Sequence, residues 1–199
     1  YGSTIEEARA DLFGLYYIAD SKLTELGLTP DKDAYCSQYY TYMMNGLLTQ
    51  LTRIKPGKQI EEAHMRNRAL IARWTLDNYP NAVQLVKNNG KTYVVINDFR
   101  KLRDAFATLL AEIQRIKSEG DYFAARTLVE KYAIYVDTDL HREVLERYNK
   151  LGIAPYKGFI NPHMQLVKDE QGKVTDVRLD YTEAYDEQML RYSSEYGFL

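Results

Sequence analysis

Three carboxylates stand at the head of the first predicted helix, and they constrain the fold of this chain more than any other feature. Glu6, Glu7 and Asp11 precede a run of eight uncharged residues, 12–19. At 100° per residue, Glu7 and Asp11 lie on one line of the helix, which later apolar residues extend. We therefore expect the helix to be buried nearly all round, with these carboxylates pointing where the apolar residues point. A metal ion or buried histidines would compensate charges in that position.

A local explanation for Glu7 is also open. Thr4 and Glu7 have the spacing of a capping box, in which the glutamate accepts a hydrogen bond from the Thr4 backbone N–H. Glu6 in the first turn would suit the positive end of the helix dipole. Asp11 does not fit this explanation, because it lies beyond the first turn and its charge repels that of Glu7 at i+4.

The charge balance excludes two classes of partner. Lys and Arg number 26 against 28 Asp and Glu, which gives a net charge of −2 spread along the chain in both signs. Neither a nucleic-acid face nor a polybasic membrane patch is indicated. The longest apolar stretch is too short to span a bilayer. We expect no nucleic-acid partner and no membrane partner.

The cysteine count bears on the cellular compartment of the protein, and the first residue bears on whether the chain is part of a longer protein. A single cysteine, Cys36, excludes an internal disulfide and favours a reducing compartment, so the expected location is cytoplasmic. Tyr1 is not a methionine, and the carboxylates of the first helix lack partners visible in the sequence. The chain is therefore expected to be a piece of a longer protein.

Periodicity and turn signals predict a mainly α fold, a helical bundle with two small β-hairpins. Helices are predicted over 4–26, 29–54, 59–77, 99–118, 121–132, 138–151 and from 182 onward, and hairpins over 83–96 and 165–179. Residues 1–155 are expected to form the helical part, and residues 156–199 a hairpin and helix that could dock elsewhere than on the bundle.

Residues 6–11 read Glu-Glu-Ala-Arg-Ala-Asp and are followed by Gly-Leu-Tyr at 14–16. This string resembles the second signature, Glu-Glu-x-Arg-Ala-(Glu/Asp), of the dipeptidyl peptidase III family of zinc metallopeptidases. The resemblance implies that Glu7 is the third protein ligand of a catalytic zinc. It also implies that Glu6 and Asp11 accept hydrogen bonds from the ring N–H groups of the two histidine ligands, and so orient them.

Two further segments are similar to the same family. Residues 62–68, Glu-Ala-His-Met-Arg-Asn-Arg, resemble its substrate-side helix. This implies that His64 hydrogen-bonds the peptide carbonyl and stabilises charge in the transition state, and that Arg68 holds the substrate or orders the site. Residues 156–162 are similar to a basic stretch near the family's C-terminus, which adds Lys157 as a substrate-binding candidate.

One departure from the family pattern limits what this chain can do alone. The His-Glu-x-x-Gly-His string that carries the other two zinc ligands and the general base is absent. The histidines present are His64, His141 and His163, and no pair has the spacing to chelate from one helix. His141 and His163 are expected at the surface and in a loop. The isolated chain should neither bind Zn²⁺ tightly nor cleave peptides, because two histidines must come from outside it.

The sequence thus predicts the C-terminal part of a zinc-dependent dipeptidyl peptidase, which releases dipeptides from the N-termini of short peptides. Its partners would be those peptides and the missing N-terminal portion of the same protein. The alternative is a non-catalytic helical interaction domain that uses its many tyrosines, 18 in all, to hold a protein partner. In that case the acidic motif would be a capping box and a salt-bridged face.

Overall fold

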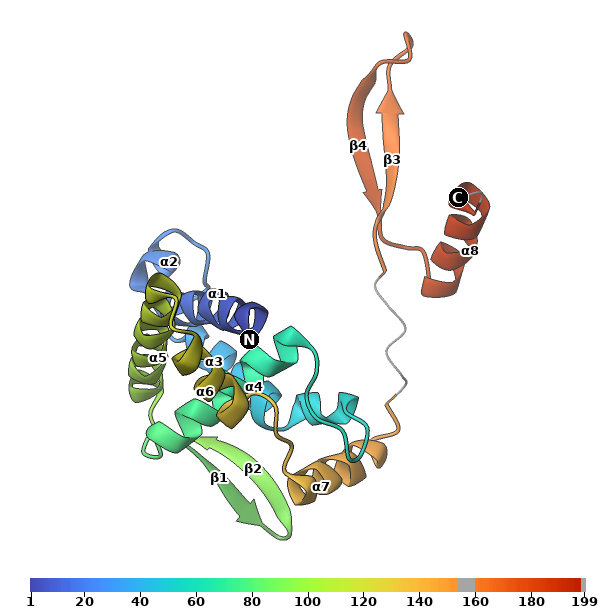
Figure 1. Ribbon diagram of the computed structural model, residues 1–199. Coiled ribbons are helices and arrows are strands. Elements are labelled where there is room, and N and C mark those ends of the chain that lie inside the picture. Colours follow the sequence, from blue (N-terminus) through green and yellow to red (C-terminus); the bar gives the residue numbers. More distant parts are fainter. Residues whose placement is uncertain (154–159, 198–199) are drawn as a thin grey trace. The chain divides into compact units, whose positions relative to one another are not determined.

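A computed structural model describes residues 1–153 and 160–197, and the chain divides into two compact units, Tyr1–Gly152 and Ile153–Leu199 (Figure 1). The predicted class, mainly α with two small β-hairpins, is confirmed. In the first unit the elements are α1 (Gly2–Ile18), α2 (Ser21–Glu25), α3 (Ala34–Leu47), the 3₁₀ helix η1 (Thr49–Arg53), α4 (Ala63–Asn78), β1 (Val83–Asn88), β2 (Lys91–Ile96), α5 (Phe99–Glu119), α6 (Tyr122–Tyr132) and α7 (Thr138–Asn149). Within the described ranges, no helix combines the length and apolar character that crossing a bilayer requires.

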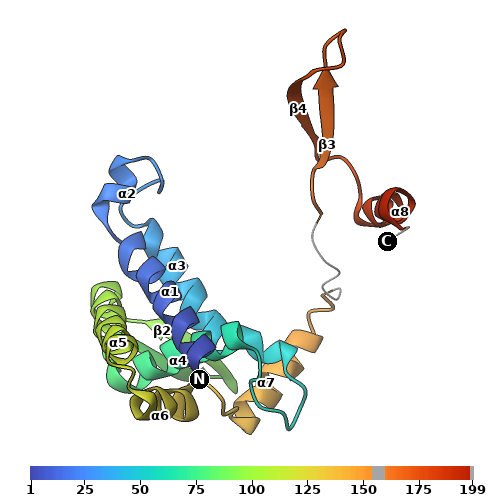
Figure 2. The same cartoon turned by 45° about the horizontal axis from the view of Figure 1, so that its top comes forward.

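The core of the first unit lies where α1, α3, α4 and α5 meet. Figure 2 shows α5 along one side of α1 and α3 along the other, and α1 also packs on α4. Tyr39 of α3 joins three of these helices. Its ring meets that of Phe106 edge to face at 4.9 Å between centroids, and its hydroxyl donates to the Leu15 carbonyl oxygen at 2.7 Å. Both rings are fully buried, so this contact fixes α3 against α1 and α5.

The expectation that the first helix is buried nearly all round is wrong. Its buried residues are Thr4, Ile5, Ala8, Leu12 and Leu15, which form one stripe. Phe13 and Tyr17 remain 37% and 51% exposed, and their rings stack on each other at 6.2 Å. Helices α4 and α5 pack against α1, and the side of α1 that carries Phe13 and Tyr17 is left uncovered by the described residues.

Several predicted helix boundaries are wrong because side-chain caps interrupt the apolar pattern. The carboxylate of Asp20 accepts from the Lys22 N–H at 2.9 Å, so α1 ends at Ile18 and the separate helix α2 follows. The carboxylate of Glu62 caps the N–H groups of His64 and Met65 in the same way, and α4 begins at Ala63. These local bonds stop helices that periodicity alone would extend.

The second predicted helix is also shorter than expected. It begins at Ala34 and ends at Leu47, after which η1 carries the chain onward. The Gln50 side-chain amide donates to the Gly46 carbonyl oxygen at 3.1 Å, and this bond takes an acceptor that a continuing helix would use.

At Gly46, α3 and α4 approach closely. A Cβ at this position would lie 2.5 Å from the Arg68 carbonyl oxygen and 2.6 Å from the Ala72 Cβ. Both neighbours belong to α4, and neither is the end of a flexible side chain. Only glycine allows this distance between the two helices.

The first hairpin forms as predicted. Strands β1 and β2 pair antiparallel from Val83 opposite Ile96 to Asn88 opposite Lys91. The two turn residues, Asn89 and Gly90, have φ of 49° and 73°, which the twist of a two-residue hairpin turn requires.

The second unit contains β3 (His163–Lys168), β4 (Val174–Asp180) and α8 (Tyr185–Tyr196). The predicted hairpin is confirmed, and His163 begins β3 instead of lying in a loop. Thr182 does not cap the last helix, because its N–H and hydroxyl bind the Asp180 carboxylate. The helix begins at Tyr185, where Glu187 accepts from the Ala184 N–H at 2.8 Å.

Candidate functional site

Helix α1 places Glu7 and Asp11 one turn apart at the edge of its buried stripe. Because Ile5, Ala8 and Leu12 pack into the core, the rotation of the helix is fixed. Glu7 and Asp11 are consequently half-buried, facing α4 at the border between core and solvent. The prediction that they point where the apolar residues point therefore holds only in part, because they lie beside the buried residues and are themselves only half-buried.

Glu7 meets His64, which stands in the first turn of α4. The His64 Nδ1 lies 3.2 Å from the Glu7 Oε2, and the two side chains remain 57% and 35% exposed. The capping-box explanation for Glu7 is wrong, because α1 begins at Gly2 and Thr4 already lies inside the helix. Among the described residues, no lysine or arginine pairs with Glu7. Its carboxylate is therefore available to a cation.

Asp11 is held by two neutral donors. The hydroxyl of Tyr42 and the side-chain Nδ2 of Asn67 each donate to its Oδ2 at 2.8 Å. Asn67 is buried, and its own Oδ1 finds no hydrogen-bond partner in the part of the chain that the structure describes. A buried amide oxygen in this position could accept a hydrogen bond from a group that lies outside the described residues.

Burial strongly raises the pKa of Tyr42, and the charge of Asp11 and the hydrogen bond to it act in the same direction. The positive charge of Arg68 opposes this shift in the pKa of Tyr42. The hydroxyl of Tyr42 consequently remains protonated and donates to Asp11 throughout the neutral range.

Glu6 differs from its neighbours because two cations neutralise it. The Arg9 Nη2 lies 2.5 Å from one carboxylate oxygen and the Lys117 Nζ 2.5 Å from the other. The hydrogen bond from Arg9, followed by that from Lys117, lowers the pKa of Glu6 to about 2. Any imidazole N–H that binds Glu6 must therefore share an oxygen with one of these cations.

The structure thus brings Glu7, Asp11 and His64 together where α1 and α4 meet, and it turns Glu6 towards α5. Arg68 lies one turn after His64 on α4. Lys157 lies outside the described residues.

Sequence reasoning missed three contacts: Tyr42, Asn67 and Lys117. Asn67 carried a usable signal, because an amide inside an apolar helical stripe needs a buried partner. Nothing in the spacing pointed to Lys117.

The donor set fits part of a zinc site. A catalytic zinc takes three protein ligands, usually imidazoles and carboxylates, and keeps one position for water. The described residues contain no group of three possible ligands, and the carboxylate of Glu7, with no lysine or arginine beside it, offers one suitable donor. A complete site would need ligands from outside these residues.

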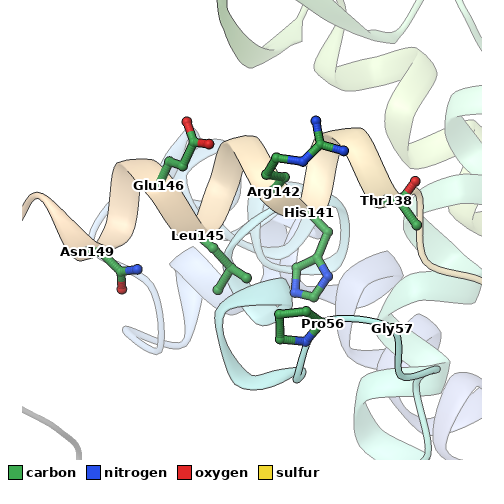
Figure 3. Close-up of a pocket in the computed structure, with 8 residues that line it drawn as sticks. All are labelled: Pro56, Gly57, Thr138, His141, Arg142, Leu145, Glu146 and Asn149. Atoms are coloured by element: carbon green, nitrogen blue, oxygen red, sulfur yellow. The ribbon is translucent and has the colours of Figure 1, made fainter.

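His141 is not the surface residue that the sequence suggested. It is 4% exposed, and its Nε2 lies 3.0 Å from the carbonyl oxygens of both Leu51 and Ile54. Figure 3 shows the ring turned from α7 towards Pro56, and both residues line a pocket. Because both acceptors are carbonyls, Nε2 carries the proton and fastens α7 to the end of η1.

Comparison with known protein families gives a match. The model of the family described as Peptidase family M49 matches residues 1–187 of the 199-residue chain. No curated protein matches the chain.

Proposed function

This chain belongs to peptidase family M49, the dipeptidyl peptidase III family, and on that premise we propose that it is the C-terminal part of a zinc-dependent dipeptidyl peptidase. The family implies a metallopeptidase that acts on peptides and generally depends on zinc. The finer proposal is that the enzyme releases dipeptides from the N-termini of short peptides. One observation supports the zinc site of this proposal: Glu7, which no lysine or arginine of the described residues neutralises, faces an imidazole beside a second, firmly held carboxylate.

Glu7 is the proposed zinc ligand. When bound, zinc would supply a Lewis acid for the scissile carbonyl and a water whose pKa is lowered to about 7. Asp11 and Glu6 would accept hydrogen bonds from the N–H groups of two ligating histidines. Asp11 suits this role better than Glu6 does, because neutral donors hold Asp11 while two cations occupy Glu6.

His64 and Arg68 are the proposed substrate-side residues. His64 is more than half exposed at the start of α4, so it can donate to a peptide carbonyl beside the metal. Arg68 follows one turn later on the same helix, where its charge could hold the substrate. Lys157 stays in the proposal as a third substrate-binding residue.

The two histidine ligands and the general base would come from the missing N-terminal portion of the protein. The sequence of the longer protein tests this directly, because a His-Glu-x-x-Gly-His string should lie upstream of Tyr1. An upstream region without that string would contradict the peptidase proposal and favour the helical interaction domain. A cytoplasmic location stays part of the proposal, since Cys36 is a free thiol.

The second unit is proposed to dock on another lobe of the protein. Met164, Leu166, Val177 and Leu179 form an exposed apolar face of its hairpin, and the first and last of these are register partners. Isolated two-stranded hairpins are marginal in water. Cover from another part of the protein would stabilise this one.

Replacing Glu7 tests the proposed function. In the full-length protein, Glu7→Ala should lose bound zinc and dipeptide release, measured by metal analysis and by hydrolysis of a dipeptide-releasing substrate. His64→Ala should lose turnover but keep the metal. Glu25→Ala is the matched control, because Glu25 is an exposed carboxylate paired with Lys22 on α2. Unchanged zinc in Glu7→Ala would refute the assignment.

A further inference from the structure

We propose that Tyr42 and Asn67 are positioning residues for Asp11, which hold one of its carboxylate oxygens so that the other faces an incoming imidazole N–H. This inference rests on the proposed function of Asp11 as the partner of a zinc-ligating histidine.

The two hydrogen bonds occupy one oxygen of the Asp11 carboxylate and leave the other oxygen open. Both donors, from α3 and α4, bind the same atom, Oδ2, and each bond measures 2.8 Å. Among the described residues, none donates a hydrogen bond to Oδ1, and the side chain keeps partial exposure. Two fixed donors on one oxygen set both the position and the rotation of the carboxylate plane. The geometry leaves Oδ1 as the acceptor for a group that arrives from outside.

The close approach of α3 and α4 creates this double contact. Tyr42 lies one turn before Gly46, and Asn67 immediately precedes Arg68, whose carbonyl oxygen lies against Gly46. The missing side chain at Gly46 lets the two helices approach until both donors reach one carboxylate. Asn67 is fully buried, so its amide cannot swing away without losing its packing.

The neutrality of both donors matters for the proposed role. A phenol and an amide fix Asp11 without cancelling its charge, whereas Arg9 and Lys117 neutralise Glu6. A full negative charge on Asp11 strengthens its hydrogen bond to an imidazole N–H and raises the basicity of the ligating nitrogen. Asp11 therefore has a fixed orientation, and its two hydrogen-bond donors do not neutralise its charge.

Tyr42→Phe in the full-length protein tests the inference. The substitution removes the hydroxyl but keeps the ring, so Asp11 should become free to rotate. We expect zinc affinity, measured by competition with a chelator, to fall about tenfold, the lower end of the range for lost outer-shell partners. Asn67→Leu, a near-isosteric change that removes the other donor, should act in the same direction.

Tyr39→Phe is the matched control. Tyr39 lies one turn earlier on α3, and its hydroxyl also bonds to α1, but to the Leu15 backbone and not to Asp11. Thermal unfolding should show that both Tyr→Phe variants lose stability, while only Tyr42→Phe should lose zinc affinity. An equal loss of affinity in both variants would mean a general structural effect and would overturn the inference.

A double-mutant cycle shows whether Tyr42 acts through Asp11. In an Asp11→Ala background, Tyr42→Phe should no longer change zinc affinity, because the group that it positions is gone. An undiminished effect in that background, or unchanged affinity in the Tyr42→Phe single variant, would overturn the inference. Zinc retained by Glu7→Ala would instead refute the proposed function, so the two failures are distinguishable.

Discussion

Replacing Gly46 by alanine tests the helix contact on which the site depends. The added methyl carbon would lie 2.5 Å from the Arg68 carbonyl oxygen and 2.6 Å from the Ala72 Cβ. Atoms in ordinary van der Waals contact lie about 3.5–4.0 Å apart. The neighbours are a backbone atom and the first atom of a side chain, so α3 and α4 themselves must move apart.

The expected cost follows from two opposing effects. Alanine in place of glycine inside a helix normally stabilises by about 0.5–1 kcal/mol, because the unfolded chain loses conformational freedom. Overpacking a core costs about 1–3 kcal/mol, and two contacts this short place Gly46→Ala at the upper end of that range. The net loss in the free energy of unfolding should be about 2 kcal/mol.

Equilibrium urea unfolding, followed by far-UV circular dichroism, measures this loss. Gly14→Ala is the control, because Gly14 lies inside α1 and a Cβ there meets nothing within 4 Å. That variant should be about 0.5–1 kcal/mol more stable than the natural chain. If Gly46→Ala were as stable as Gly14→Ala, the close approach of the helices would not be the constraint that we infer.

Two further predictions concern the packing of the first unit. Because the folded pKa of Glu6 is lowered from 4.5 to about 2, its ion pairs stabilise fully above about pH 4.5, and this stabilisation is lost as the pH falls towards 2. Urea midpoints should therefore be lower for Lys117→Met than for the natural chain at pH 6, and the difference should shrink at pH 3; a constant difference would contradict the pairing. His141→Phe should lower the free energy of unfolding by about 1–3 kcal/mol, because it leaves the Ile54 carbonyl oxygen without a donor among the described residues, while the Leu51 carbonyl oxygen keeps only the Ile54 N–H. Arg142→Ala, at an exposed position on α7, should change it little, and equal effects of both variants would count against the role of His141.

Local chemistry was enough to predict some elements. The Asn89-Gly90 turn between β-branched segments specified the first hairpin, because the two residues tolerate positive φ. Asp98 at the start of α5 and left-handed Gly120 at its end were likewise readable, since a cap depends only on residues a few positions away.

Other boundaries depended on which of several local bonds forms. Asp20 and Glu62 both have side chains that can cap a helix. The apolar pattern continued across each of them, however, and periodicity favoured longer helices. The exposure of Phe13 and Tyr17 could not be predicted either, because it depends on how many neighbours α1 has.

The sequence by itself determined the family, the helical class and the identity of the residues proposed for the site, since a motif is a property of consecutive residues. Only the tertiary structure decided how the three carboxylates differ. Lys117 neutralises Glu6 across 111 positions of sequence, His64 meets Glu7, and Tyr42 with Asn67 holds Asp11. Each partner comes from another helix, and the packing of the core sets those distances. Carboxylates that look alike in one string thus acquire separate environments.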